Sequence, residues 1–360
     1  MAITGNKGEW SEVYTLFRLL GEGKVYAGDA NLNKLNLYYP ILNIIREESK
    51  KYEYQPDADH NIVVVNEDGK ELIRFPMTKF MSESISLLQA INSTSKSSFE
   101  VPSTESFMGQ IGCSKLKASS TDKSDIHIII HDLRTNMTPL LGFSIKSQLG
   151  RASTLLNATD CTNITYRIVN KKMSDSDIVA INSIDDHLPR MKALLGSGFK
   201  LEYFDVEHAT FKNNLLFLDC CMPQFIAQCL ICDSMPNSTS SIKDAVAVVA
   251  ANNPFAFSGK NILKFYEHKM KVLLLAAALG MMPSKEWTGH YDANGGYLVV
   301  RKDGEIVCYH FYNQNDVEDY LYNNTRFERG SRSRHHFGSL YRGSDGEVYI
   351  KLNLQIRFIK

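Results

Sequence analysis

Two charged residues lie at the end of a predicted β-hairpin, where they could act on one substrate. Asp125 precedes the apolar run IHIII, and Lys146 lies in the following apolar run, GFSIKSQL. Alternate side chains of a strand share a face, so we expect Ser144, Lys146 and Gln148 on one side of the second strand. A charge at the end of a buried hairpin is costly without partners, which favours a chemical role. A solvated surface pair is the alternative.

An aspartate and a lysine held close together are suited to phosphodiester hydrolysis. Carboxylate oxygens are ligands that Mg²⁺ prefers in proteins, and the bound ion stabilises charge on the phosphate and activates water. A nearby Lys counters the developing negative charge and can position the attacking water. We therefore predict that Asp125 binds Mg²⁺, that Lys146 assists the attacking water, and that Gln148 can orient it.

This arrangement resembles the core of the PD-(D/E)xK nucleases, in which an Asp on one strand is followed by an acidic residue and a Lys on the next. Ser144 occupies the acidic position here, so the motif reads SxK and one metal ligand is missing. In several such nucleases the first helix supplies a Glu. The run EWSEVYTLFRLL has helical spacing of its apolar residues and carries Glu9 and Glu12. Either can be the second metal ligand, and Glu12 is preferred.

Several separate segments, in the same order, look like the HpaII family of type II restriction endonucleases. They are NKGEWSE (6–12), KSDIHIIIHD (123–132), GFSIKSQLG (142–150), TLLNAT (154–159) with TNITYRI (162–168), and NLQIRF (353–358). The resemblance covers nearly the whole chain. It implies a Mg²⁺-dependent nuclease that cuts a short palindromic site in double-stranded DNA. By resemblance alone, the site is CCGG, cut after the first C to leave 5′-phosphate ends, and a cognate DNA methyltransferase protects host DNA without having to bind this chain.

The densest basic run of the chain, TRFERGSRSRHHF, lies at 325–337, although the net charge of the whole chain is zero. Arg can bind guanine O6 and N7 together and Glu can accept from cytosine N4, so the predicted base readers are Arg326, Glu328 and Arg329. Contacts to phosphate would instead fix the register without reading sequence. The further predicted DNA contacts are Arg332, Arg334, His335, Lys7, Ser147, Arg151 and Asn163. A solvated loop with counter-charges supplied by the fold is the alternative.

The composition, with 44% apolar and 22% charged residues, is typical of a globular protein. Seven scattered cysteines, most of them in apolar runs, indicate buried free thiols in a reducing cytoplasm. The family resemblance implies that the cell is prokaryotic. Cys229 and Cys232 have CxxC spacing, but no second pair or His follows at zinc-site spacing, so redox or zinc use is not favoured. The most apolar stretch, 272–283, is shorter than the about 20 residues of a membrane helix, and no membrane association is expected.

The expected fold is α/β: a PD-(D/E)xK nuclease core with a mixed central sheet flanked by helices, additional helical insertions and a C-terminal β-rich region. A single nuclease domain, 1–360, is expected to divide into four regions. These are an N-terminal region with the Glu-bearing helix (1–92), catalytic core strands (105–170), a helical region (171–290) and a DNA-recognition region (291–360). The Ser/Thr-rich stretch 92–104 is the predicted linker. Hairpins are predicted at 61–76 and 295–313, and a helix from Pro40 to about Lys51.

Two other functions remain open at the level of the sequence. The same chemistry would serve a structure-specific or repair nuclease, which would cut branched DNA without sequence preference. The basic run alone would serve a non-catalytic DNA-binding protein. A palindromic target favours a homodimer, while a monomer could nick each strand in turn.

Overall fold

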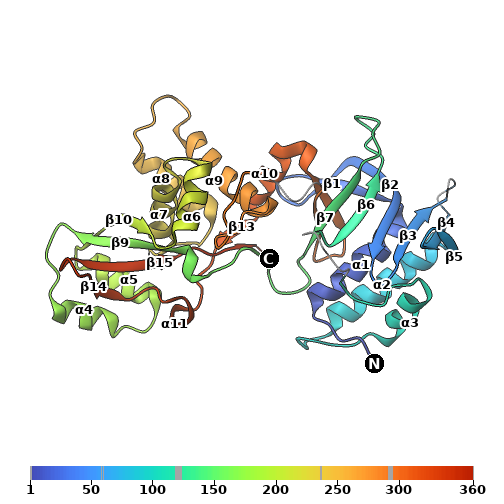
Figure 1. Ribbon diagram of the computed structural model, residues 1–360, viewed down its shortest axis with the longest axis horizontal. Helices are drawn as coiled ribbons and strands as arrows, with labels where there is room; N and C mark the ends of the chain where they lie inside the picture. The colour runs from blue at the N-terminus through green and yellow to red at the C-terminus, as the bar shows by residue number, and fades with distance from the viewer. Residues whose placement is uncertain are drawn as a thin grey trace. The chain divides into compact units, whose positions relative to one another are not determined.

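The structure, a computed structural model, describes residues 2–57, 59, 61–117, 124–235, 237–290 and 295–359. The described chain is a mixed α/β protein that divides into two compact units, labelled by element in Figure 1. The first unit comprises Met1–Ser153, Asp292–Tyr320 and Lys360, and the second comprises Thr154–Tyr291 and Leu321–Ile359. The chain therefore leaves the first unit, builds most of the second, and returns to complete the first.

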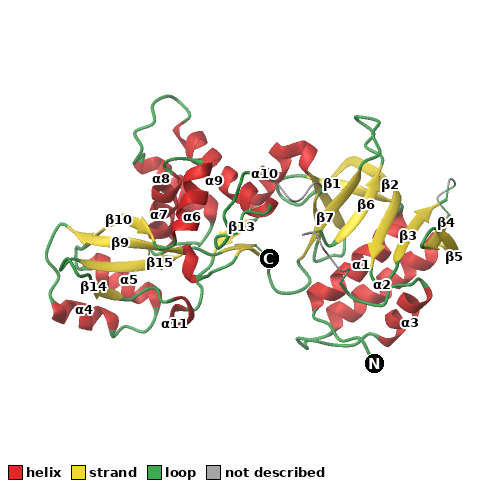
Figure 2. Ribbon diagram, in the orientation of Figure 1, coloured by secondary structure: helices red, strands yellow, loops and turns green. Residues whose placement is uncertain are grey.

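The first unit is built on a nine-stranded sheet in the order β1-β12-β11-β7-β6-β2-β3-β4-β5. Figure 2 draws the strands in yellow and the helices in red. The strands are β1 Lys24–Gly28, β2 Lys34–Glu47, β3 Lys51–Pro56, β4 Ile62–Glu67, β5 Lys70–Pro76, β6 Ile126–Ile130, β7 Leu140–Ser147, β11 Gly296–Val300 and β12 Ile306–His310. Pairing is antiparallel except that β11 lies parallel to β7 and β12 lies parallel to β1. The sheet is mixed because β11 and β12 enter beside β7 from a distant part of the sequence.

Helices α1 Lys7–Glu22, α2 Met77–Ser93 and α3 Pro102–Gln110 pack against this sheet through a common apolar core. The first of them, α1, starts with a capping box. The Asn6 side chain accepts from the Gly8 and Glu9 amides, and the Glu9 carboxylate accepts from the Asn6 amide. Its apolar stripe includes the fully buried Trp10 and Phe17. The cap and the stripe fix both the start of α1 and the face that it turns toward the sheet.

The second unit has a four-stranded sheet in the order β10-β9-β15-β14 and a three-stranded sheet in the order β13-β16-β8. The strands are β8 Thr154–Leu156, β9 Asn163–Val169, β10 Lys200–Val206, β13 Thr325–Phe327, β14 Leu340–Arg342, β15 Val348–Asn353 and β16 Ile356–Phe358. The helices are α4 Asp175–Asn182, α5 His187–Gly196, α6 Ala209–Leu218, α7 Met222–Asp233, α8 Ile242–Asn252, α9 Ile262–Leu279 and α11 Arg332–His335. The chain passes between the units within α10, Gln314–Asn323.

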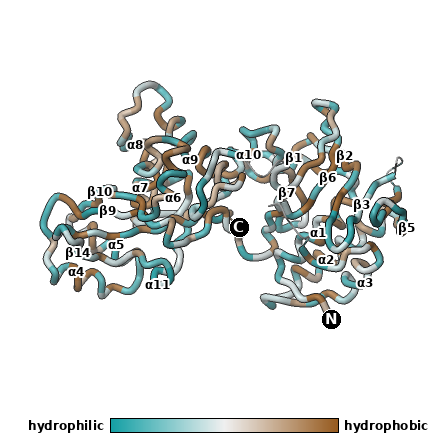
Figure 3. Tube along the Cα trace, in the orientation of Figure 1, coloured by the Kyte–Doolittle hydropathy of each residue, from teal (hydrophilic) through white to brown (hydrophobic). Residues whose placement is uncertain are grey.

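Apolar segments run through the elements of both units, among them β6 in the first and α7 in the second (Figure 3). Helix α7 buries most of its side chains, Phe225, Ile226 and Cys229 completely. Within the described ranges, no single helix is both long and apolar enough to cross a membrane, although α6 and α7, bent by 103°, pass that test as a pair.

The hairpins predicted at 61–76 and 295–313 are confirmed as β4–β5 and β11–β12, and the first predicted helix is confirmed as α1. The helix predicted from Pro40 is wrong, because these residues form the second half of β2. That segment pairs with β6 on one side and with β3 on the other, and its buried Ile41 and Ile44 suit a central strand. The region 171–290, predicted as helical, also contains the strand β10. The nuclease-type core and the division into four regions stay predictions.

Candidate active site

Asp125 is fixed at the start of β6 by the neighbouring strand β7. Its amide donates to the carbonyl of Phe143 at 2.8 Å. Its side-chain Oδ2 accepts from the Ile145 amide at 2.6 Å and from the Ser144 hydroxyl at 3.2 Å. The carboxylate is therefore held across the end of the hairpin and cannot swing away without losing two hydrogen bonds.

Ser144 connects this carboxylate to Lys146. The Lys146 Nζ donates to the Ser144 Oγ at 3.4 Å, and that hydroxyl donates onward to Asp125. The predicted alternation on β7 thus does bring Ser144 and Lys146 together on one side. Burial lowers the pKa of Lys146, while the negative charges of Asp125 and Glu12 act in the opposite direction. The three residues form one line of polar contacts at the hairpin end.

Glu12 reaches the same place from α1. The pKa of Glu12 is raised to about 8, first by burial and second by the negative charge of Asp125. The positive charges of Lys117 and Arg46 act in the opposite direction and lower this pKa. A buried carboxylate beside a second negative charge is the kind of oxygen donor whose charge a divalent cation balances. Asp125 and Glu12 therefore fit a Mg²⁺ ion by the chemistry of their oxygen ligands.

The position of Glu12 follows from how α1 is attached to β7. The hydroxyls of Ser11 and Ser147 lie 2.7 Å apart, and Ser11 also donates to the Lys7 carbonyl at 2.6 Å. Gly150, just after β7, lies so near α1 that a Cβ atom there would be 3.2 Å from the Cβ of Lys7. Ser147 and Lys7, both predicted DNA contacts, therefore lie at the junction of α1 and β7. Arg151 follows directly and is exposed.

Glu9 has a different position and different partners. One of its carboxylate oxygens accepts from the Asn6 amide at 2.9 Å, and the other lies 3.4 Å from the Lys117 ammonium. Its side chain closes the cap of α1. Both Asp125 and Glu9 act electrostatically on Glu12, and the effect of Asp125 is the larger.

Tyr297, which sequence reasoning missed, lies beside this group on β11. It is in register with Ser144 in the parallel pairing of β11 with β7, and its ring centroid is 5.3 Å from the Lys146 Nζ. Burial raises the pKa of the Tyr297 hydroxyl, and the negative charge of Asp125 raises it further. Gly295 permits this register, because a Cβ there would lie 2.3 Å from the Gly142 carbonyl oxygen. Only the pairing of strands distant in the sequence reveals this neighbour.

Gln148 follows β7 and is half-buried, and its amide donates to the Val300 carbonyl at 2.9 Å. This bond extends the pairing of β7 with β11 beyond Ser147. The backbone of Gln148 is thus fixed on the sheet that carries Lys146 and Tyr297.

The predicted base readers lie in the second unit and have counter-charges within it. Arg326, on β13, pairs with Glu328 at 3.0 Å, and Glu328 also pairs with Arg357 at 3.2 Å. Arg329 pairs with the buried carboxylate of Asp233 at 3.2 Å and donates to the Asp233 carbonyl at 2.8 Å. Ion pairs within the second unit therefore already balance the charges of Arg326, Glu328 and Arg329.

The other predicted DNA contacts of the basic run lie on the short helix that follows. Arg332, half-buried, and Arg334, exposed, lie on the short helix α11. His335 is half-buried, with Nδ1 3.8 Å from an Asp160 oxygen.

Asn163 is buried in a polar network behind this loop. It donates to Glu207 and to the His335 carbonyl, each at 2.9 Å, and accepts from Asn353 at 2.7 Å. These contacts support the backbone of the basic run from within the unit.

Similarity to known proteins covers both units. The HpaII restriction endonuclease family matches residues 6–358. The chain belongs to this family. The type II restriction enzyme HpaII of Haemophilus parainfluenzae is 43% identical over 360 residues, which cover 99% of each chain. The HpaII-family membership that the sequence segments indicated is confirmed, and no solved structure matches the chain.

Proposed function

We propose that this protein is a Mg²⁺-dependent type II restriction endonuclease that cuts both strands of duplex DNA at a short palindromic site. The observation that carries the proposal is the line of contacts from Asp125 through Ser144 to Lys146, with Glu12 brought to it by α1. Membership of the HpaII family supports it. The core around β6 and β7 would then be of the PD-(D/E)xK type, with Ser144 in the acidic position.

In this proposal Asp125 and Glu12 are the metal ligands. Bound there, Mg²⁺ would stabilise charge on the scissile phosphate and lower the pKa of a coordinated water. Ser144 does not replace the missing ligand. Its hydroxyl donates to Asp125 and so orients the carboxylate that remains. Glu9 is the less suitable second ligand, because its carboxylate closes the cap of α1.

Lys146 supplies the positive charge that the reaction needs at the phosphate. Its ammonium can donate to the attacking water or to a phosphate oxygen, where it opposes the charge that develops in the transition state. The Tyr297 ring, 5.3 Å from Nζ, contributes a cation–π contact that positions the Lys146 side chain. Gln148 follows on the same face and can orient the water.

We further propose CCGG as the recognition site, cut after the first C, since the named relative is the HpaII enzyme. Arg326, Glu328 and Arg329 would exchange their present ion-pair partners for base edges. Phosphates would be contacted by Arg332, Arg334, His335, Lys7 and Arg151, and further polar contacts would come from Ser147 and Asn163. A palindromic site favours a homodimer, and a cognate methyltransferase would protect the same site in cytoplasmic host DNA.

The experiment is digestion of a plasmid of known sequence with and without Mg²⁺, followed by mapping of the ends. We expect Mg²⁺-dependent fragments with 5′-phosphate ends at one four-base site. Asp125→Ala and Lys146→Ala should each abolish cleavage while DNA binding survives, and Lys302→Ala, in the turn between β11 and β12, should cut normally. Full activity of either site variant would refute the assignment. Cutting of branched DNA without sequence preference would indicate a structure-specific nuclease, and binding without cutting a non-catalytic protein.

A further inference from the structure

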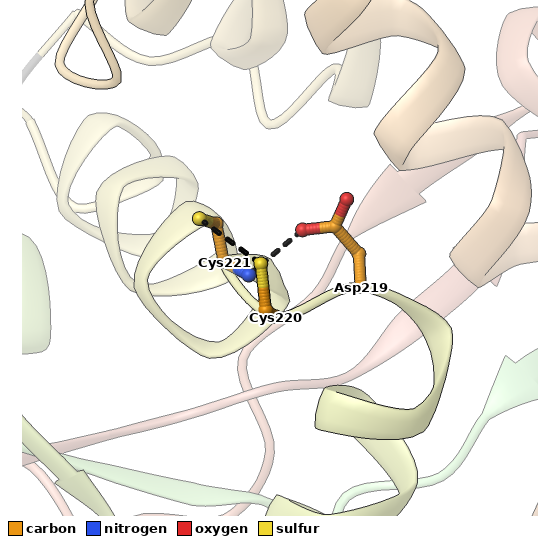
Figure 4. Close-up of side chains that lie close together, drawn as sticks. All are labelled: Asp219, Cys220 and Cys221. Atoms are coloured by element: carbon orange, nitrogen blue, oxygen red, sulfur yellow. Dashed lines mark hydrogen bonds between the residues drawn. The ribbon is translucent and has the colours of Figure 1, made fainter.

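The turn between α6 and α7 gathers two thiols and a carboxylate at one point of the second unit. Asp219, Cys220 and Cys221 form this turn, and one ligand atom from each lies within 4.8 Å of the others (Figure 4). Asp219 shapes the turn twice. Its carbonyl accepts from the Met222 amide at 2.9 Å, and its Oδ1 accepts from the Cys221 amide at 2.8 Å. The three side chains are therefore held by a hydrogen-bonded backbone.

The distance between the two thiols matches one tetrahedral metal ion. The sulfur atoms of Cys220 and Cys221 are 3.8 Å apart. In a tetrahedral zinc site with Zn–S bonds of about 2.3 Å, two sulfur ligands are about 3.8 Å apart. A disulfide would require a sulfur–sulfur distance of about 2.05 Å. At this spacing one thiol can donate a hydrogen bond to the other, and the two sulfur atoms also suit one tetrahedral ion without moving apart.

The carboxylate of Asp219 has a partner that orients it. The Lys269 Nζ, on α9, donates to Asp219 Oδ2 at 2.5 Å. Lys269 is 9% exposed, and its Nζ lies 5.8 and 5.5 Å from the ring centroids of Phe255 and Phe257. A carboxylate has about four lone-pair positions, so these two hydrogen bonds leave room for a metal. Carboxylates that ligate metals are commonly held by such outer contacts.

The site is open to an entering ion and selects a soft one. Cys220 is exposed and Cys221 is half-buried. Thiolate sulfur binds soft and borderline cations such as Zn²⁺, Cd²⁺ or Cu⁺ in preference to Mg²⁺. The Mg²⁺ that nuclease chemistry requires would therefore not fill this place.

We propose that Asp219, Cys220 and Cys221 bind one thiophilic d¹⁰ cation of the Zn²⁺ type, with water in the fourth position. Binding replaces two thiol protons by two metal–sulfur bonds and releases both protons to solvent. The ion joins the end of α6 to the start of α7, where the chain bends by 103°. The folded turn holds the three ligands in one arrangement, whereas the unfolded chain only keeps them adjacent in sequence. The ion therefore binds the folded chain more tightly and stabilises the second unit.

The test uses the full chain, freshly reduced and free of metal, titrated with Cd²⁺ as the probe. We expect the ultraviolet cadmium–thiolate band to saturate at one equivalent. Cys220→Ser and Cys221→Ser should each weaken binding at least about 100-fold. The matched control is Cys232→Ser, a half-buried thiol near the other end of α7, which should bind as the wild type does. Lys269→Met should weaken binding about tenfold although both thiols remain.

A second measurement needs no variant. Zn²⁺ should slow alkylation of Cys220 in the wild-type protein and raise the midpoint of thermal unfolding, and circular dichroism shows whether each variant is folded. Absence of the one-equivalent band in the wild type would overturn the proposal. So would equal binding by a Cys220→Ser, Cys221→Ser double variant, or alkylation of Cys220 that Zn²⁺ leaves unchanged. A native thiol titration that finds these two cysteines already oxidised would also overturn it.

Discussion

Glu12→Gln should lose DNA cleavage and yet gain stability when no metal is present. In the folded protein the pKa of Glu12 is about 8 instead of 4.5. At pH 7 the unfolded chain has released this proton and the folded chain retains it, which costs up to about 3 kcal/mol at 1.36 kcal/mol for each pKa unit. Solvent screens part of this cost because Glu12 is half-buried. A neutral Gln should therefore stabilise the metal-free protein by about 1 to 2 kcal/mol.

The same substitution removes one of the two carboxylates that are proposed to hold Mg²⁺. Loss of a metal ligand should lower the cleavage rate by about a thousandfold, which corresponds to about 4 kcal/mol of transition-state stabilisation. Mg²⁺ should also stabilise the wild type in thermal unfolding more than it stabilises Glu12→Gln, because only the wild type retains both ligands. Cleavage and unfolding are thus expected to change in opposite directions.

Glu9→Gln is the matched control, three residues away on the same helix. Gln can also accept from the N-cap amide in a capping box, so the free energy of unfolding should change by less than about 0.5 kcal/mol. Cleavage should stay within about threefold of the wild type, less than 1 kcal/mol in the barrier. The assays are a plasmid cleavage time course at fixed Mg²⁺ and urea unfolding in chelator. Loss of cleavage in Glu9→Gln together with full activity in Glu12→Gln would refute the assignment of the second carboxylate.

Three further predictions concern other residues. Tyr297→Leu should lower kcat about tenfold with DNA affinity unchanged, because Lys146 loses a cation–π contact of about 1 kcal/mol. Tyr297→Phe keeps the ring and should retain most activity, so equal loss in both variants would contradict a role for the ring. Arg326→Ala should relax specificity at one base pair by about 1 to 3 kcal/mol, whereas Arg334→Ala should weaken binding to all sequences and reduce the salt slope by about one, which a binding series over salt concentration would measure. Burial lowers the pKa of His310 to about 4, and the facing charges of Arg134 and Asp132 act in opposite directions on it. As the pH falls below about 6.5, the unfolded chain binds a proton at this His that the folded chain does not bind. The free energy of unfolding should therefore drop by about 2 kcal/mol at pH 5. His310→Gln should remove that part of the acid sensitivity, as measured by urea unfolding.

The sequence predicts the parts of this site that depend on local periodicity. The apolar spacing of 9–20 gives α1, and the apolar runs on either side of residues 131–139 give β6 and β7. The alternation on β7 correctly places Ser144 beside Lys146. Each of these inferences needs only the repeat of a helix or a strand, which neighbouring residues specify.

The parts that sequence reasoning missed depend on contacts between distant segments. The helix expected from Pro40 is a central strand, because pairing on both sides outweighs a short apolar pattern. Tyr297 joins the site only through the parallel pairing of β11 with β7. The counter-charge of Arg329 comes from Asp233, nearly a hundred residues earlier in the chain. No local pattern specifies such neighbours.

The serine in the SxK motif also changes what the rest of the first unit must do. An acidic residue at 144 would place a second carboxylate against Asp125, where Ser144 now donates at 3.2 Å. The serine removes that repulsion but also an acidic ligand, and in the proposed metal site the second carboxylate comes from α1. Metal binding in this proposal would depend on how α1 lies on β7, which the Ser11–Ser147 contact at 2.7 Å helps to fix. The proposed site thus ties activity to the attachment of the first helix, whereas an acidic residue at position 144 would place both ligands on the hairpin itself.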